Sequence, residues 1–91
     1  MSDRVRANIV VRGRVQGVFF RESCRREAEA AGVTGWVYNH ADGTVRAHFE
    51  GSPEAVRRMV AWAHRGPAAA VVERVDEREA PAEGGSTFDV R

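Results

Sequence analysis

The stretch GRVQGVFFR, residues 13–21, joins a segment with the periodicity of a strand to a segment with the periodicity of a helix. Before it, apolar side chains alternate with mostly polar ones, which predicts a strand over residues 4–12 with one buried face. After it, apolar side chains recur at intervals of four, four and three residues, which predicts an amphipathic helix closed by Gly32. The apolar positions of the two segments are Val5, Ala7, Ile9, Val11, Phe20, Cys24, Ala28 and Ala31.

The rest of the chain predicts a hairpin, a second helix and two further strands. The Asp42–Gly43 pair lies between two β-rich runs and is a strong hairpin signal. Ser52 and Pro53 supply an N-cap and a first helical residue for a second helix, which we expect to stop near Gly66. The polar residues 82–86 predict a mobile loop before the last strand. The expected strands of this part are residues 33–38, 44–50, 71–78 and 88–91.

This order of elements, β-α-β-β-α-β with a short fifth strand, predicts a ferredoxin-like α+β sandwich with two helices on one face of a mostly antiparallel sheet. A chain of 91 residues is too short for two cores, so residues 1–91 are expected to form a single domain. A right-handed crossover through the first helix makes the strands before and after it parallel. The loop after Arg12 and the region of Asn39 are therefore expected to converge at one pole of the sheet.

Composition excludes several classes of function. Apolar residues make up 43% of the chain and charged residues 30%, which is the balance of a folded soluble protein. Lysine is absent, so lysine nucleophiles and Schiff bases are excluded. The net charge of +1 provides no long-range field for nucleic acid or an anionic membrane, and we expect neither partner. A single cysteine and the lack of a signal-like or membrane-spanning run favour a cytoplasmic protein, which we expect to be a monomer.

The loop over residues 13–21 has the chemistry of an anion site. Gly13 and Gly17 permit positive φ or close backbone approach, so the N–H groups between them can turn toward a common centre. The loop precedes a helix N-terminus, whose free N–H groups and dipole favour phosphate. Arg21, in the first turn, can present a planar fork of donors to phosphoryl oxygens.

The same residues have plainer interpretations. Two glycines in a connecting loop are more often a bend than a phosphate site, and Arg21 can pair with Glu22, Glu50 or another surface acid. Gln16 can be an ordinary turn residue. Three apolar residues of the stretch are expected to anchor the core rather than contact a ligand: Val15, Val18 and Phe20.

Asn39 ends a predicted strand at the pole where the loop lies. Its amide offers both a donor and an acceptor, so it can hold a water molecule in one orientation without titrating. The alternative is that Asn39 only begins the hairpin, a common use of asparagine. Taken by itself, the residue favours the hairpin interpretation.

Two motifs that follow one another along the chain favour the anion site over an ordinary loop and hairpin. Gly13-x-Val15-Gln16-Gly17-Val18-x-Phe20-Arg21, followed by Gly35-Trp36-Val37-x-Asn39-x-x-x-Gly43-x-Val45, resembles the two signatures of the acylphosphatase family. Gly66-Pro67 and the closing Phe88-x-Val90-Arg91 extend the resemblance over essentially the whole chain.

The resemblance implies hydrolysis of small acyl phosphates to a carboxylate and inorganic phosphate, with no metal and no cofactor. It implies that Arg21 binds the phosphate and that Asn39 orients the attacking water. It also implies that a phosphate or sulfate ion binds at a backbone cradle. The substrate-binding residues of this cradle are Gln16, Gly17, Val18, Phe19, Phe20 and Arg21.

The sequence departs from the family pattern at Tyr38, His40 and Val71. His40 beside Asn39 leads to the hypothesis of a pH-dependent charge near the site, because unperturbed imidazole titrates near ~6.5. A His40→Gln variant with an unchanged pH–rate profile would refute it, and a solvated hairpin histidine is the plainer interpretation.

Other chemistry is less favoured by the sequence. His40, His48 and His64 lack ligand spacing and are interpreted as surface residues rather than a metal site. Cys24 is expected to be a buried small hydrophobe, and the two tryptophans to be packing residues. Two rival functions stay open: a non-catalytic binding module for acyl phosphates or small anions, and an RNA-binding domain of the same topology.

Overall fold

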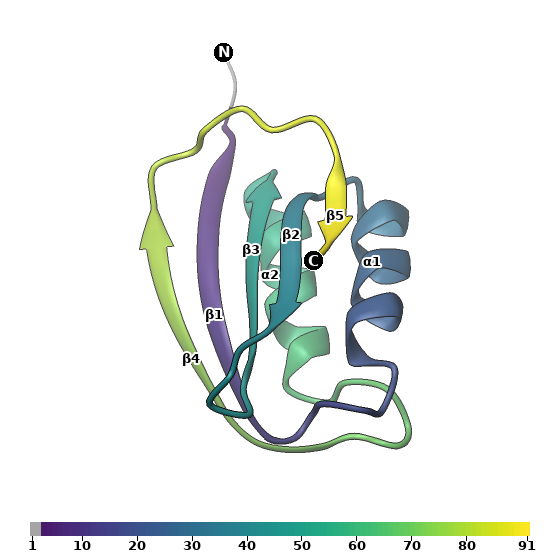
Figure 1. Cartoon of the computed structure of the whole chain (residues 1–91). Coiled ribbons are helices and arrows are strands. Elements are labelled where there is room, and N and C mark those ends of the chain that lie inside the picture. The colour runs from purple at the N-terminus through teal and green to yellow at the C-terminus, as the bar shows by residue number, and fades with distance from the viewer. Residues whose placement is uncertain (1–2) are drawn as a thin grey trace.

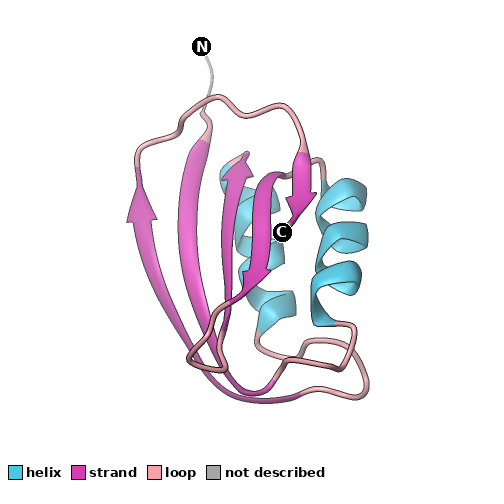
Figure 2. Ribbon diagram, viewed as in Figure 1, coloured by secondary structure: helices cyan, strands magenta, loops and turns pink. Residues whose placement is uncertain are grey.

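The computed structural model describes residues 3–91 and contains two helices packed on one face of a five-stranded sheet (Figures 1 and 2). The predicted ferredoxin-like α+β sandwich is confirmed, while residues 1–2 of the expected domain lie outside the described part. Neither helix in residues 3–91 is long and apolar enough to cross a membrane. In chain order the elements are β1 (Val5–Arg14), α1 (Phe20–Ala31), β2 (Thr34–Asn39), β3 (Val45–Gly51), α2 (Pro53–Ala63), β4 (Val71–Ala80) and β5 (Phe88–Val90).

The sheet has the strand order β4-β1-β3-β2-β5. β3 pairs antiparallel with both β1 and β2, so these two strands run in the same direction on either side of it. Val45 is the register partner of Val11 in β1 and of Asn39 in β2. The end of β2 therefore lies level with the last part of β1, and the β1–α1 loop and the β2–β3 hairpin emerge at the same end of the sheet (Figure 1).

The core lies between the sheet and the two helices. Alternate side chains of β1 face the helices, as the period of two predicts, and β3 shows the same alternation. Phe20, Cys24 and Ala28 of the apolar stripe predicted for α1 are buried against the sheet, as is the apolar side of α2. Ser52 caps α2 by accepting a hydrogen bond from the Ala55 N–H at 3.2 Å. Trp62 packs on Phe20 with ring centroids 5.1 Å apart, so one aromatic pair joins the two helices. The largest fully buried side chains include Phe20, Phe49, Met59, Val11, Val15, Val37 and Val45.

Strand β1 is longer than the sequence predicts and ends at Arg14 rather than Arg12. A bulge between Arg12 and Gly13 shifts the register while pairing with β4 continues. Gly13 has φ 130°, and a Cβ there would lie 2.2 Å from the Val71 carbonyl oxygen. Close approach of β4 therefore explains Gly13, which belongs to the sheet rather than to an anion-binding loop. Strand β4 likewise extends to Ala80, two residues beyond the prediction.

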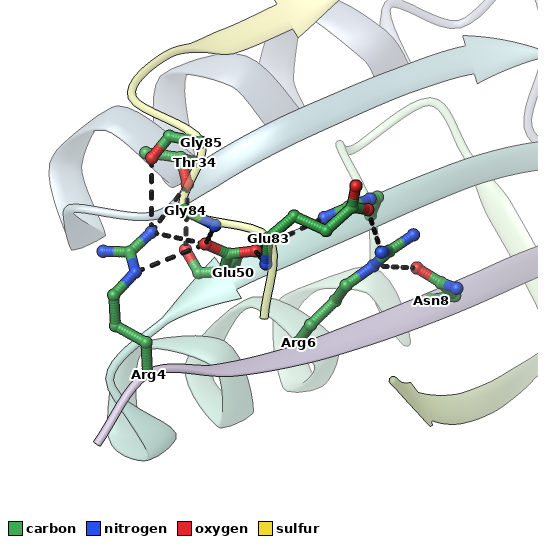
Figure 3. Close-up of polar contacts among 9 residues, drawn as sticks. Arg4, Arg6, Asn8, Thr34, Glu50, Glu83, Gly84 and Gly85 are labelled. Atoms are coloured by element: carbon green, nitrogen blue, oxygen red, sulfur yellow. Dashed lines mark hydrogen bonds and ion pairs between the residues drawn. The ribbon is translucent and has the colours of Figure 1, made fainter. Parts of the chain in front are cut away.

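The loop between β4 and β5 is tied to the sheet by Glu50 (Figure 3). The Glu50 side chain is 1% exposed and accepts hydrogen bonds from the backbone N–H groups of Glu83 at 2.6 Å and Gly84 at 2.7 Å. The Arg4 guanidinium lies 3.0 Å from the same carboxylate. Burial acts to raise the pKa of Glu50, but these hydrogen bonds and the Arg4 charge outweigh it and lower the pKa to about 2. These contacts do not fit the freely mobile loop that the polar sequence predicts.

The expectation that all three histidines lie on the surface is wrong for His48. Its side chain is buried on the face of the sheet away from the helices, with its ring centroid 5.2 Å from that of Trp36 and its Nε2 3.9 Å from the Glu50 carboxylate. Desolvation, with the charge of Arg6, lowers the pKa of His48. His48 lines one hollow on this face together with Glu83 of the tethered loop, an arrangement of distant segments that strand periodicity does not reveal.

Candidate active site

Three segments that are distant in sequence surround one cavity of about 400 Å³ at the end of the sheet. They are the β1–α1 loop with the first turn of α1, the end of β2 and the end of β5. The cavity brings Arg21 and Asn39 together, as the topology predicts. Its lining residues are Val15, Gly17, Phe19, Phe20, Arg21, Glu22, Asn39 and Val90.

The β1–α1 loop leaves a row of backbone donors without protein partners. Gly17 and Phe19 both have positive φ, 73° and 63°, and no side chain caps the N-terminus of α1. The first hydrogen bond of the helix runs from the Ser23 N–H to the Phe19 carbonyl oxygen at 3.1 Å. Within residues 3–91, no hydrogen bond is donated by the backbone N–H groups of residues 16–22. An anion at this helix end would find free donors and the positive end of the helix dipole.

Gln16 ties this loop to the β2–β3 hairpin. Its side-chain Nε2 donates to the carbonyl oxygens of His40 at 2.7 Å and Thr44 at 3.0 Å. The interpretation of Gln16 as an ordinary turn residue is therefore wrong, because its amide is a fixed link between the two halves of the site.

The predicted cradle residues divide into two groups. Gly17, Phe19, Phe20 and Arg21 line the cavity, whereas the other two do not. The side chain of Gln16 is engaged with the hairpin, and Val18 packs against the core. Gln16 and Val18 can therefore bind an anion only through their backbone N–H groups.

Arg21 is oriented by the C-terminal strand. Its Nη1 donates to the carbonyl oxygen of Arg91 at 3.0 Å. The alternative that Arg21 pairs with Glu22 or Glu50 is wrong, because Glu22 binds Arg25 and Glu50 binds the guanidinium of Arg4. Within residues 3–91 no Asp or Glu side-chain carboxylate lies within 4.0 Å of the Arg21 guanidinium, so no acidic side chain neutralises its charge there.

Asn39 is the last residue of β2 and is half-buried at the cavity wall. Its side-chain amide makes no hydrogen bond within residues 3–91. A donor and an acceptor are thus both available for a water molecule between this residue and the loop.

The two residues that flank Asn39 lie outside the cavity lining. His40 Nδ1 is 3.0 Å from the Asp42 carboxylate, and Tyr38 packs on Trp36 with ring centroids 5.3 Å apart. Hydrogen bonds from Thr44 lower the pKa of Asp42, so this carboxylate stays ionised beside His40. These contacts agree with a hairpin histidine, and the hypothesis of a pH-dependent role for His40 stays a prediction.

Within residues 3–91, no serine, threonine, cysteine or histidine side chain lines the cavity. Cys24 is fully buried, and desolvation raises the pKa of its thiol well above its usual range. Within residues 3–91, no three histidine, cysteine or acidic side chains are grouped to hold a metal ion.

The sequence did not reveal the contribution of β5. Val90 lines the cavity and the Arg91 carbonyl oxygen orients Arg21, because β5 pairs in parallel with β2 beside the site. Parallel pairing between residues 53 positions apart, such as Gly35 and Phe88, leaves no local pattern, and only the closing motif of the family resemblance could have indicated it.

The fold and the cavity define a small ferredoxin-like domain with an arginine, an asparagine and a helix N-terminus around one site. The acylphosphatase family model matches residues 7–90. An acylphosphatase of Synechococcus sp. is 52% identical over 91 residues, which cover 100% of this chain and 97% of that protein. The chain belongs to the acylphosphatase family, whose members are hydrolases of the anhydride bond in acyl phosphates.

Solved structures agree with this assignment. An acylphosphatase from Coxiella burnetii has a TM-score of 0.94 at 38% identity, and the match covers 98% of this chain and 94% of that one. The acylphosphatase from Bacillus subtilis has a TM-score of 0.90 at 32% identity, and the match covers 96% of this chain and 98% of that one.

Proposed function

We propose that this protein hydrolyses small acyl phosphates with Arg21 and the backbone N–H groups of residues 16–21 binding the phosphoryl group. Asn39 orients the attacking water. The observation that carries the proposal is that Arg21 and Asn39 line one cavity at the uncapped N-terminus of α1. A guanidinium, a set of free N–H groups and a neutral amide are thereby available to one phosphate-sized ligand.

These groups suit phosphoryl transfer from a mixed anhydride. The water oxygen forms a bond to phosphorus as the bond from phosphorus to the acyl oxygen breaks, and the carboxylate leaves with that electron pair. The dianionic acyl phosphate and water yield a carboxylate and dihydrogen phosphate. A loose transition state of this kind needs alignment and charge stabilisation more than a protein nucleophile.

The site does not need a strong base. Glu22 lines the cavity, but a hydrogen bond from Arg25 lowers the pKa of its carboxyl, which makes it a weak proton acceptor. The carboxylate is already a good leaving group, so Asn39 has only to hold the water in line. The contact between Arg21 and the Arg91 carbonyl oxygen fixes the guanidinium before substrate arrives, which favours catalysis by preorganised charge.

The test is to incubate the purified protein with benzoyl phosphate and follow its disappearance, with and without EDTA. We expect hydrolysis far above the spontaneous rate and unchanged by the chelator. Saturable binding without turnover would refute the proposal in favour of an anion-binding module. An RNA gel shift without hydrolysis would favour the RNA-binding alternative.

Four further expectations belong to the same proposal. We propose that residues 1–91 form a single domain, that the protein is a monomer in the cytoplasm, and that a phosphate or sulfate ion binds at the cradle. Gel filtration tests the monomer, and a phosphate titration tests the ion site. Neither a second copy nor a membrane is needed to complete the cavity described above.

A further inference from the structure

Exposed hydrophobic side chains gather at the cavity. Four large hydrophobic residues are exposed within residues 3–91: Val5, Phe19, Val71 and Val90. Two of them, Phe19 and Val90, line the cavity that contains Arg21 and Asn39. Phe19 is 81% exposed, the largest value of the four. The mouth of a site built for an anion thus carries apolar surface that the core does not use.

Folding does not account for a phenylalanine at position 19. Phe19 is the one non-glycine residue with positive φ within residues 3–91, a conformation that costs a bulky L-residue free energy. It occupies the N-cap position of α1, where small polar residues are favoured, and its side chain caps nothing. Backbone strain of this kind is concentrated at ligand-binding sites.

The neighbouring aromatic residue fixes the position of Phe19. Phe20 is buried and packs on Trp62 of α2, so the start of α1 is anchored in the core. The two phenylalanines therefore diverge, with Phe20 directed into the protein and Phe19 into solvent at the cavity. On the β5 side, Val90 directly precedes Arg91, whose carbonyl oxygen holds Arg21. Apolar surface from two elements thus borders the phosphate-binding groups.

We propose that Phe19 and Val90 form the binding site for the acyl group, and that the protein prefers acyl phosphates with an aryl or extended alkyl group. The inference rests on the proposed function, because the phosphoryl group must occupy the cradle for the acyl group to reach these side chains. Burying the apolar part of the substrate against them removes apolar area from water on both partners. Acetyl phosphate, with a single methyl group, gains less from this contact.

The test compares kcat/KM for benzoyl phosphate and acetyl phosphate in matched variants. Removing one apolar contact from a half-open subsite should change the selectivity between substrates by about tenfold, which is the lower end of the range for hydrophobic pockets. Phe19→Ala should therefore lower the ratio of kcat/KM for benzoyl phosphate to that for acetyl phosphate about tenfold. Val90→Ala should lower it less than Phe19→Ala does, and Phe19→Leu should retain most of the preference. Val71→Ala, which removes an exposed valine side chain on β4 that does not line the cavity, should leave the ratio and the activity unchanged.

Alanine retains a Cβ, so Phe19→Ala removes the ring without giving the loop the freedom of glycine. An unchanged ratio in Phe19→Ala overturns the inference. An equal loss for both substrates, with weaker inhibition by inorganic phosphate, also overturns it, because the effect would then lie in the cradle.

A second measurement separates this inference from the proposed function. Benzoylphosphonate and acetylphosphonate are analogues that do not turn over, and their dissociation constants can be measured by calorimetry. Tighter binding of the aryl analogue that is lost in Phe19→Ala supports the acyl subsite even if neither acyl phosphate is hydrolysed. Equal affinity of the two analogues in the unmodified protein contradicts it even if hydrolysis is fast.

Discussion

Glu50→Gln tests the polar cluster that holds the β4–β5 loop. The carboxylate accepts two short backbone hydrogen bonds and one ion pair, and glutamine keeps the shape but loses the charge and one acceptor oxygen. A lowering of the pKa from 4.5 to about 2 is equivalent to about 3 kcal/mol of stability at neutral pH. Arg4 is partly solvated, so we expect a loss of about 2 kcal/mol in the free energy of unfolding.

The pH dependence of this loss has a definite sign. Because the pKa of Glu50 is lower in the folded than in the unfolded state, the contribution is present in full above pH 4.5 and disappears as the pH falls toward about 2. The difference between the original protein and Glu50→Gln should therefore be largest near neutral pH. It should shrink as the solution is acidified through this window.

Urea unfolding followed by tryptophan fluorescence at pH 7 and pH 3 measures both effects. The matched control is Glu29→Gln, which removes an exposed ion pair with Arg25 on α1 and should cost less than about 0.5 kcal/mol. A loss below about 0.5 kcal/mol for Glu50→Gln at pH 7 would refute the reasoning. So would a deficit that is the same at both pH values.

Two other predictions concern the packing of the sheet and the core. Gly35→Ala would place a Cβ 1.7 Å from the His48 carbonyl oxygen, so we expect a loss of more than about 3 kcal/mol in thermal or urea unfolding. Gly84→Ala, with positive φ but no atom within 4 Å, should cost only the conformational strain of about 1–2 kcal/mol, and equal losses would contradict the account. Cys24 should resist a thiol reagent in the folded protein at pH 8 because burial raises its pKa, and rapid labelling without denaturant would contradict this.

The sequence predicts those parts of the fold that depend on local patterns. The period of two in β1, the Asp42–Gly43 turn and the Ser52–Pro53 start of α2 each follow from interactions among nearby residues. The errors arise where distant segments meet. The register shift at Gly13 lies in the pairing with β4, and His48 is buried where Trp36 and the loop that Glu50 holds lie close to it.

The features of the site also divide into those that the sequence predicts and those that depend on contacts between distant segments. The meeting of Arg21 and Asn39 follows from the direction of two strands, which the order of the elements determines. The Gln16 link to the hairpin and the Arg91 contact with Arg21 depend on how far one side chain reaches and where a three-residue strand docks. Neither contact follows from the periodicity or the turn signals of the sequence.

Steady-state kinetics of Asn39→Ala and Arg21→Ala with benzoyl phosphate test the proposed site most directly. We expect Arg21→Ala to lose at least about 10²-fold in kcat/KM, because one preorganised donor to developing charge is removed. Asn39→Ala should lower kcat much more than it changes KM, since the water and not the phosphate loses its partner. Losses of less than about tenfold in both variants would contradict the assignment of these two residues.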